Sequence, residues 1–425
     1  MRVAVFGAGY VGLVTGACFA ELGHDVVVRD VVADKVDALR RGEVPIHEEG
    51  LDDLLDRNRE RLGFTTDVDE SVEGAEVVYV AVGTPPTYSG DADLSAVWTV
   101  VDELPRVDRR IVVAMKSTVP VGTGRTVRHR LDERGLGNVG YVSNPEFTAE
   151  GTAVRDFMHP DRIVIGAFDA ADAEVVERVH TGIDAPVICC DVASAEMIKL
   201  AANAALVTRI SFINEIANVC EATGADVLTV AEGIGLDRRI GPAFLKAGIG
   251  FGGSCFPKDS LALKQLAANS GYSFQLLNAV IEVNELQKRR VIGKLERRLG
   301  SLRGKKVALL GLAFKPGTDD MREAPSLVLA GRLLAEGAAV SAWDPVADGR
   351  LHLDGVDVAG SALEALDGAD AAILVTEWPE LRELDWAEAG ARMRKRVLVD
   401  GRNMLDPVEM RALGFDYEGI GRAAE

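Results

Sequence analysis

The segment of the chain with the most distinctive chemistry is the decapeptide GFGGSCFPKD at residues 250–259. Its glycines allow the backbone to turn tightly and to come close to a ligand. Cys255 is followed by Lys258 and then Asp259, and a thiol reacts as its thiolate, which a neighbouring cation favours. A structural cysteine in a buried turn is the alternative, but a lysine and an aspartate are rarely buried without partners. The pattern therefore predicts a cysteine nucleophile beside groups that handle protons.

A second motif, GAGYVG at residues 7–12, follows a predicted strand and opens a predicted helix. In a βαβ unit its glycines make the turn, admit a pyrophosphate and pack the helix on the strand, while the helix N–H groups face the phosphates. Asp30 ends the next predicted strand, where an acid bonds a ribose 2′-hydroxyl and repels a 2′-phosphate. The setting predicts a dinucleotide site that prefers NAD to NADP. Two alternatives stay open, because Lys35 could assist a 2′-phosphate and Asp30 could be an ordinary acid at a strand end.

The decapeptide resembles the nucleophile loop of the UDP-glucose/GDP-mannose dehydrogenase family, whose members use NAD to oxidise an alcohol of a sugar nucleotide twice, to a carboxylate. Further segments match motifs of the family along nearly all 425 residues. These segments are VGTPP at 82–86, KSTVPVG at 116–122, SNPEFTAEG at 143–151, EMIKLAAN at 196–203, FLKAGIGFG at 244–252, GLAFKPGTDDMRE at 311–323 and DGRN at 400–403. One departure is Thr148, where the family commonly has leucine, and we expect its effect to be minor.

The resemblance implies roles for individual residues. Its catalytic set would be Cys255, Lys199, Asn203, Asp259, Glu146 and Thr118. Cofactor contacts would come from Gly7, Gly9, Tyr10, Val11, Gly12, Asp30, Lys35, Thr84, Thr118, Glu150, Lys258 and Arg322. Substrate contacts would come from Glu146, Phe147, Glu150, Lys199, Asn203, Arg239, Lys246, Phe251, Gly252, Lys315 and Arg402. Arg239 is implied to reach the site of a neighbouring subunit, which predicts a homodimer or a higher homo-oligomer.

The same resemblance implies a sequence of chemical steps. Hydride leaves C6 of the sugar for NAD while water held by Asp259 and Lys199 takes the hydroxyl proton. Cys255 then attacks the aldehyde to give a thiohemiacetal, and a second hydride transfer gives a thioester that Glu146 and Asp259 help water to hydrolyse. Lys199 and Asn203, one helical turn apart on a shared face, would stabilise the oxyanions. Without the resemblance, Lys199 would be interpreted as a solvated lysine on an amphipathic helix.

The elements that must position these residues predict an α/β fold with two doubly wound, Rossmann-like domains joined by a central helical region with a long helix. Short apolar runs alternate with helical stretches in the first half, which indicates βαβ units and a parallel sheet. We expect an NAD-binding domain at 1–192, a helical dimerisation domain with the cysteine loop at 193–300 and a UDP-sugar-binding α/β domain at 301–425. Predicted strands are 3–6, 26–29, 77–82, 111–115, 140–143, 162–165, 187–190, 307–310, 339–343, 371–375 and 397–399, and helices are predicted over 13–22, 196–223 and 261–299.

The composition excludes several classes of protein. The formal net charge of −19 makes nucleic acid and anionic membranes poor partners, and no stretch is apolar enough to span a bilayer. Five scattered cysteines show neither a disulfide framework nor metal-ligand spacing, and the N-terminus opens directly into a predicted strand without a signal peptide. We therefore expect a cytoplasmic enzyme without a metal. The acidic, arginine-rich composition is similar to that of proteins from salt-rich cytoplasms and equally to ordinary acidic surfaces, so a halophilic source stays open.

Three alternatives to oxidation of UDP-glucose remain. The same chemistry could act on another sugar nucleotide, such as GDP-mannose or a UDP-N-acetylhexosamine, although the loops around residues 244–259 and 400–403 look more like the UDP-glucose branch. A one-step dehydrogenase of the 6-phosphogluconate or 3-hydroxyacid type would need no cysteine nucleophile. An inactive NAD-binding regulator would be expected to lack Cys255, Lys199 or Asp259, and all three are present.

Overall fold

The computed structural model describes residues 1–422 and divides into two compact units. The first unit contains Met1–Ala202 and Leu261–Tyr272, and the second contains Asn203–Ser260 and the chain from Ser273 onward. Two helices run through both units, α9 (Val192–Thr223) and α11 (Phe256–Asn269). The predicted division into three domains, with boundaries after residues 192 and 300, stays a prediction.

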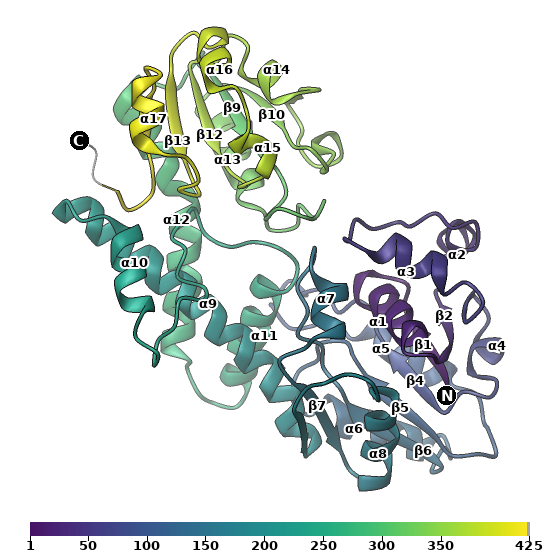
Figure 1. Cartoon of the computed structure of the whole chain (residues 1–425). Helices are drawn as coiled ribbons and strands as arrows, with labels where there is room; N and C mark the ends of the chain where they lie inside the picture. The colour runs from purple at the N-terminus through teal and green to yellow at the C-terminus, as the bar shows by residue number, and fades with distance from the viewer. Residues whose placement is uncertain (423–425) are drawn as a thin grey trace. The chain divides into compact units, whose positions relative to one another are not determined.

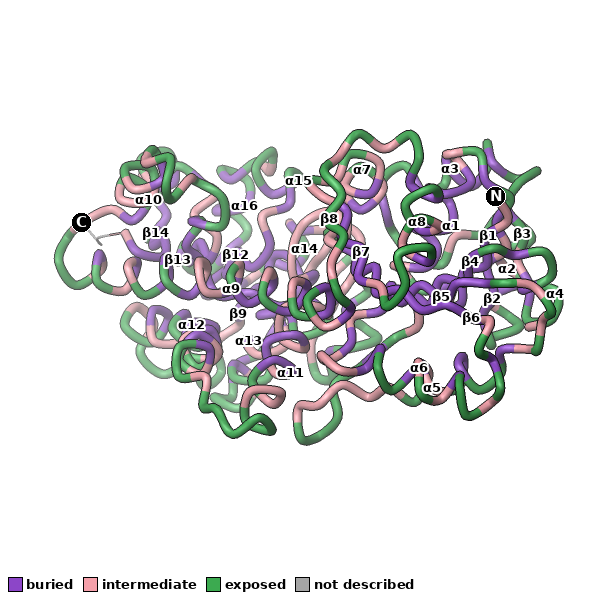
Figure 2. Tube along the Cα trace, turned by 90° about the horizontal axis from the view of Figure 1, so that it is seen from below, coloured by how far each residue is buried: buried purple, intermediate pink, exposed green. Residues whose placement is uncertain are grey.

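The first unit is built around an eight-stranded sheet of order β3-β2-β1-β4-β5-β6-β7-β8 (Figure 1). Its strands are β1 (Arg2–Phe6), β2 (Asp25–Arg29), β3 (Leu62–Thr65), β4 (Val77–Val80), β5 (Ile111–Met115), β6 (Val139–Ser143), β7 (Ile163–Ala167) and β8 (Val187–Cys190). Its helices are α1 (Tyr10–Glu21), α2 (Ala33–Arg40), α3 (Leu51–Arg57), α4 (Val68–Val72), α5 (Ser95–Glu103), α6 (Thr123–Glu133), α7 (Ala153–Met158) and α8 (Ala170–Val179). Apolar side chains of α1, α3, α7 and α8 pack on one face, and those of α4, α5 and α6 pack on the other. Strands β4 and β5 are buried along their whole length (Figure 2), as parallel strands covered on both faces must be.

The predicted parallel sheet contains one antiparallel pair of strands. Strand β7 pairs antiparallel with β6, while β8 is parallel to β7. After β6 ends, residues 144–162 stay near the carboxyl edge of the sheet with only the short helix α7. Because this segment makes no crossover to the opposite edge, which parallel pairing requires, β7 runs back along its neighbour.

The second unit has a parallel six-stranded sheet of order β11-β10-β9-β12-β13-β14. Its strands are β9 (Lys306–Leu310), β10 (Ala339–Trp343), β11 (Val356–Val358), β12 (Ala371–Leu374), β13 (Val397–Asp400) and β14 (Asp416–Glu418). Its helices are α10 (Val227–Gly235), α12 (Gln275–Leu299), α13 (Pro325–Ala335), α14 (Ala362–Leu366), α15 (Pro379–Arg382), α16 (Trp386–Arg392) and α17 (Pro407–Ala412), with one 3₁₀ turn, η1 (Gly349–Leu351). One hydrophobic core joins the sheet to α9, α12 and α13.

Both sheets share the strand order of their first six members and the geometry of their first turn. Gly7 follows β1 with φ 105°, and Gly311 follows β9 with φ 91°, a conformation that L side chains rarely adopt. Asp30 follows β2 and accepts a hydrogen bond from the backbone N–H after Gly7, at 2.7 Å. Asp344 follows β10 and accepts one from the backbone N–H after Gly311, at 2.6 Å. The two α/β blocks are therefore built on one local plan.

Three strands of the structure were not predicted from the sequence: β3, β11 and β14. The last two are three residues long with the sequences VDV and DYE, and all three lie at or near a sheet edge, where apolar runs are not needed on both faces. Helix α1 begins at Tyr10 rather than at the predicted position 13. Within residues 1–422, no helix combines the length and apolar character needed to cross a bilayer.

Candidate active site

The turn after β1 leaves room for a ligand where the sequence predicts one. A Cβ at Gly7 would lie 2.6 Å from the backbone oxygen of Ala81, and a Cβ at Gly12 would overlap the oxygen of Gly7. A Cβ at Gly9 would meet nothing within 4 Å. Gly9 is also the N-cap of α1, and no described side chain caps it. Open space in front of uncapped helix N–H groups fits the pyrophosphate of a dinucleotide.

Asp30 is fixed at the end of β2 by three donors. Its carboxylate accepts from the N–H of Ala8 at 2.7 Å, from the N–H of Val32 at 3.0 Å and from Lys35 Nζ at 3.2 Å. Burial alone would raise its pKa, but the two N–H groups and Lys35 hold the pKa below its usual range. Asp30 is therefore ionised at neutral pH, and the Lys35 ammonium is paired with it.

The loops that follow β4 and β5 contact each other at the carboxyl edge of the first sheet. Thr84 Oγ1 donates to the backbone oxygen of Thr118 at 2.9 Å, and Ser117 Oγ donates to the oxygen of Val82 at 2.7 Å. The predicted cofactor residues Thr84 and Thr118 thus come from two segments that hold one another in place.

Glu146 and Lys199 form a buried ion pair, with 2.7 Å between Lys199 Nζ and Glu146 Oε1. The other carboxylate oxygen of Glu146 accepts from the N–H of Thr148 at 2.7 Å and from its hydroxyl at 2.9 Å. Burial would raise the pKa of Glu146, but Lys199 and Thr148 keep it below its usual value. The departure at Thr148 therefore adds a hydroxyl donor to a candidate catalytic carboxylate, which leucine could not supply.

Two aromatic residues of the first unit, Phe147 and Tyr10, make further contacts with predicted site residues and with their loops. The ring of Phe147 lies under the Arg162 guanidinium, at 3.7 Å, and under Lys199 Nζ, at 5.6 Å. The hydroxyl of Tyr10 accepts from the N–H of Gly151 at 2.7 Å, so the GAGYVG turn is joined to the loop that carries Glu150.

In the second unit, Cys255 immediately precedes α11, and its backbone oxygen accepts from the N–H of Asp259 at 2.8 Å. The positive end of a helix favours an anionic sulfur at this position. Asp259 is buried and bonded on both oxygens, to Asn203 Nδ2 at 2.6 Å and to Lys258 Nζ at 2.6 Å. The structure thus brings Asn203 of α9 to Lys258 and Asp259, which lie in the turn after the cysteine.

The glycine-rich loop before Cys255 packs on the segment after β9. A Cβ at Gly252 would overlap the backbone oxygen of Glu323, and the N–H of Gly253 donates to the oxygen of Arg322 at 2.8 Å. Arg402 Nη1 donates to the oxygen of Gly250 at 3.1 Å. The predicted substrate residues Phe251, Gly252 and Arg402 therefore lie in one neighbourhood.

Four other predicted residues are placed on the surface or in local pairs. Arg239 is 83% exposed and pairs with Asp237 in the same turn, at 2.6 Å. Lys246 is exposed. Arg322 pairs with Asp320 at 2.8 Å, and Lys315 Nζ lies 5.6 Å from the ring of Phe314. The chain itself does not bring Arg239 to the cysteine loop.

Three buried amides that we did not single out from the sequence hold the cysteine loop. Asn284 in α12 accepts from the N–H of Phe251 at 2.8 Å and donates to its oxygen at 3.1 Å. Gln287 donates to the oxygen of Gly248 at 2.9 Å, and Asn214 in α9 accepts from the N–H of Gly248 at 2.9 Å. The signal was available, because the two α12 amides interrupt an apolar stripe of α12 at helical spacing.

Two buried charges were also missed. Lys116 follows β5 and donates to Asn144 Oδ1 at 3.2 Å, and burial lowers its pKa to about 8. Glu48 accepts from the N–H of Gly151 at 2.6 Å and of Ala153 at 2.7 Å. Lys116 stands in the KSTVPVG motif, whereas nothing in the sequence around Glu48 distinguishes it from a surface acid.

Comparison with known proteins identifies the family to which this chain belongs. Residues 1–184 match the NAD binding domain of the UDP-glucose/GDP-mannose dehydrogenase family, residues 193–286 its central domain and residues 308–407 its UDP binding domain. The UDP-glucose 6-dehydrogenase TuaD of Bacillus subtilis is 45% identical over 431 residues, which cover 100% of this chain and 94% of that protein.

Two solved structures show the same relationship. A UDP-glucose dehydrogenase from the hyperthermophilic archaeon Pyrobaculum islandicum has a TM-score of 0.93 at 40% identity, covering 99% of this chain and 98% of that one. A UDP-D-ManNAc dehydrogenase from Pyrococcus horikoshii has a TM-score of 0.88 at 29% identity, covering 99% of both chains. Since the family models and these relatives span the dinucleotide turn, the cysteine loop and both sheets, the chain is an NAD-dependent oxidoreductase of the UDP-glucose/GDP-mannose dehydrogenase family.

Proposed function

We propose that this chain oxidises UDP-glucose at C6 to UDP-glucuronate in two NAD-dependent steps, through a thiohemiacetal and a thioester on Cys255. The observation that carries the proposal is Cys255 at the start of α11, followed one turn later by Asp259 bonded to both Asn203 and Lys258. A nucleophile with a positioned carboxylate and amide beside it suits formation and breakdown of a covalent acyl intermediate. The named relatives at 45% and 40% identity support UDP-glucose as the sugar nucleotide.

Each group has a proposed task that follows from its contacts. NAD, when bound, accepts a hydride in each oxidation, and the open turn at Gly9 with Asp30 would hold its pyrophosphate and ribose. Asn203 and Lys199 would donate to the oxygen that becomes anionic as Cys255 adds to the aldehyde. Glu146 and Asp259 would activate the water that releases the acid. Thr118, Thr84 and Glu150 would line the cofactor, with Lys258 and Arg322 as further contacts.

The remaining predicted residues would recognise the UDP-sugar. Lys246, Lys315 and Arg402 supply positive charge for a diphosphate in a chain of net charge −19. Phe251 and Gly252 would place backbone and ring against the nucleotide. Arg239, which is exposed and pairs with Asp237 in its own turn, is proposed to complete the site of a second copy.

Light scattering of the purified protein should therefore give at least the mass of a dimer.

The test of this function is the yield of NADH from a limiting amount of UDP-glucose with excess NAD, at low and at molar salt. Two NADH per sugar would establish the double oxidation, whereas one would contradict the thioester mechanism. If UDP-glucose gives none at either salt concentration, the same assay with GDP-mannose and UDP-N-acetylhexosamines tests the alternative substrates, for which the 29% identical UDP-D-ManNAc dehydrogenase is the available support.

Exchange of Asp30 for asparagine should relax the preference for NAD. The N–H groups of Ala8 and Val32 donate to different oxygens of Asp30, so asparagine keeps an acceptor for one of them while it removes the charge that repels a 2′-phosphate. We expect the ratio of kcat/KM for NADP to that for NAD to rise on the order of tenfold. The matched control is Asp25→Asn, an exposed acid on the same strand, which should leave the ratio unchanged. An unchanged ratio in both variants would contradict the role of Asp30.

Exchange of Asn284 for alanine should slow turnover by misplacing the cysteine loop. The variant leaves the N–H and the oxygen of Phe251 without the amide that pairs with both. A displacement of about 1 Å at a nucleophile costs about a hundredfold in rate, so we expect kcat to fall by that order with little change in KM for NAD. Asn278→Ala on the same helix is the control, because its Oδ1 has no partner among the described residues. Equal kcat values in the two variants would exclude a positioning role.

A further inference from the structure

The second half of α12 carries an unusual concentration of positive charge. Six of the eleven residues from 288 to 298 are lysine or arginine, and one is glutamate, in a chain whose net charge is −19. Positive charges are favourable near the C-terminus of a helix. That preference is confined to the last turn, however, and does not account for basic residues more than two turns earlier.

Part of this charge is used inside the second unit. Lys294 is buried and donates to Glu221 at 2.6 Å and to Glu418 at 2.7 Å. Arg298 pairs with Glu418 and with Asp416. These bonds join α12 to the end of α9 and to β14, so both cations have a structural role.

Three arginines of this segment have exposed side chains. Arg290 is 42% exposed and lies 3.4 Å from Glu221, whose charge is already shared with Lys294. Arg297 is 61% exposed and lies 3.3 Å from Glu418. Arg289 is exposed and makes no ion pair with any other residue of the range 1–422. Their positive charge exceeds what the neighbouring acids neutralise.

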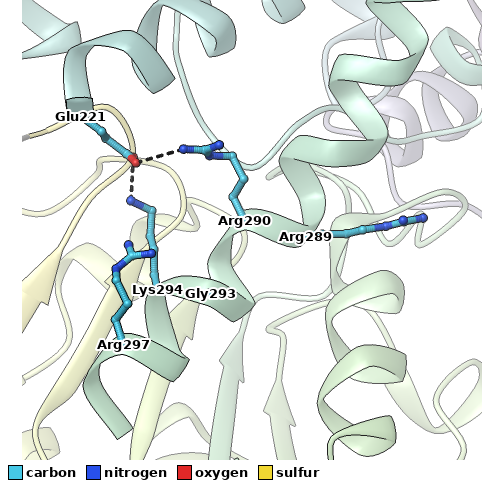
Figure 3. Close-up of a pocket in the computed structure, with 6 residues that line it drawn as sticks. All are labelled: Glu221, Arg289, Arg290, Gly293, Lys294 and Arg297. Atoms are coloured by element: carbon cyan, nitrogen blue, oxygen red, sulfur yellow. Dashed lines mark hydrogen bonds and ion pairs between the residues drawn. The ribbon is translucent and has the colours of Figure 1, made fainter. Parts of the chain in front are cut away.

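These arginines surround a hollow of about 270 Å³, lined by Glu221, Arg289, Arg290, Gly293, Lys294 and Arg297. Figure 3 shows Arg290 and Lys294 directed at the Glu221 carboxylate, with Arg297 beside Lys294 and Arg289 extending from the other side of the helix. Four cations and one carboxylate thus line the hollow, and two of the cations, Arg290 and Lys294, pair with that carboxylate. A second hollow of about 370 Å³ shares Glu221, Arg290 and Arg297 and adds Arg298, Arg422 and Glu418, with Arg298 paired to Glu418 and Arg422 to Asp226.

Gly293 is an independent indication that this surface is kept open. Glycine within a helix is less stable than alanine, so it is retained where packing or a ligand requires it. Packing does not require it here, because a Cβ at Gly293 would meet only Arg297 Nη1, at 3.9 Å. Gly293 stands four residues after Arg289 and four before Arg297, one turn from each on the same helix face. Its missing side chain leaves the floor of the hollow free between two guanidinium groups.

We propose that this hollow binds a small phosphate-bearing anion, of the class of pyrophosphate and nucleoside diphosphates. Guanidinium groups bind phosphate oxygens with paired hydrogen bonds, and several arginines around one hollow suit more than one phosphate group. A nucleic acid is disfavoured by the net charge of the chain. The inference is independent of the proposed oxidation, since none of these residues belongs to the candidate active site.

Calorimetric titration with inorganic pyrophosphate at low salt tests the proposal. The wild type should show a class of sites that is lost, or weakened at least tenfold, in the double variant Arg289→Ala/Arg290→Ala. The matched control is Arg178→Ala/Arg332→Ala, which removes the same charge from two exposed arginines of α8 and α13 and should leave the titration unchanged. Oxidation of UDP-glucose without pyrophosphate should be equal in all three proteins.

Gly293→Ala separates ligand binding from a structural role of the cluster. The added methyl group should raise the thermal midpoint, because alanine favours the helix, and should weaken pyrophosphate binding, because it fills the floor of the hollow. Titrations that are identical in the wild type and the double arginine variant would overturn the proposal. So would a double variant that keeps pyrophosphate binding but loses a dimer in light scattering, since the arginines would then serve contact between copies of the chain.

Discussion

Exchange of Cys255 for serine should abolish the formation of two NADH per UDP-glucose. The helix start of α11 can stabilise a thiolate, but a serine hydroxyl offers it no such anion. The hydroxyl is also a far weaker nucleophile than a thiolate at neutral pH. We expect the steady-state rate of NADH formation to fall at least about a thousandfold, the order seen when a covalent nucleophile is removed. A rapid-mixing experiment with limiting sugar should show at most one NADH, with the sugar retained as the aldehyde or as a hemiacetal with the introduced hydroxyl.

The control for this variant is Cys189→Ser, which removes an exposed thiol from the edge strand β8 and should keep both NADH. Mass spectrometry of the quenched wild-type protein should find the sugar attached at Cys255. A serine variant that still forms two NADH at an unchanged rate would show that no thioester lies on the path.

Exchange of Lys199 for methionine should be the most damaging single change to the first unit. Lys199 and Glu146 are both buried and 2.7 Å apart, and removal of one partner leaves a buried charge without compensation, which costs about 3–5 kcal/mol. Activity should fall by orders of magnitude as well, because the variant loses a donor for the oxyanion. Chemical unfolding and kcat, measured on the same sample, check both effects.

The loss of stability should depend on pH in a defined direction. In the wild type the pKa of Glu146 lies below its usual value, since Lys199 and Thr148 outweigh burial, so the ionised group stabilises the fold at neutral pH and this contribution is lost as the pH falls through its folded pKa. Without Lys199, burial raises the pKa, and the ionised carboxylate destabilises the fold increasingly as the pH rises above about 4. The variant should therefore be destabilised more at pH 7 than at pH 5.

The double variant Lys199→Met/Glu146→Gln distinguishes stability from catalysis. Removal of both charges should restore much of the stability, because a buried pair replaced by neutral groups of similar shape is often neutral or favourable. Activity should not return, since both proposed catalytic groups are absent. A double variant as active as the wild type would show that neither group takes part in the reaction.

The dinucleotide turn and the cysteine loop could be predicted because their residues have local reasons to be where they are. Gly7 is needed for a positive φ in the turn between β1 and α1, which is a constraint within one βαβ unit. The apolar runs of β4 and β5 have no polar interruption because both faces are covered. The family resemblance adds the roles of Glu146 and Lys199, which the residues alone leave ambiguous.

What could not be predicted depends on contacts between distant segments. Strands β11 and β14 are too short and polar to be recognised without the neighbours that pair with them. The reversal at β7 depends on the course of residues 144–162, which no local pattern encodes. Asn284 bonds to a loop 33 residues earlier in the chain. The sequence around a helical asparagine does not indicate which distant segment its side chain will contact.

The common plan of the two sheets has a consequence for the history of the gene. Substitutions erase sequence similarity one residue at a time, whereas a change of strand order requires the chain to be reconnected, so topology outlasts sequence. The shared order of strands, with a positive-φ glycine after the first strand and an aspartate after the second, is what duplication of one ancestral segment leaves behind. The sequences of the two turns now differ, with GAGYVG after β1 and GLAFKP after β9. Gly7 and Gly311 are, on this account, descendants of a single codon.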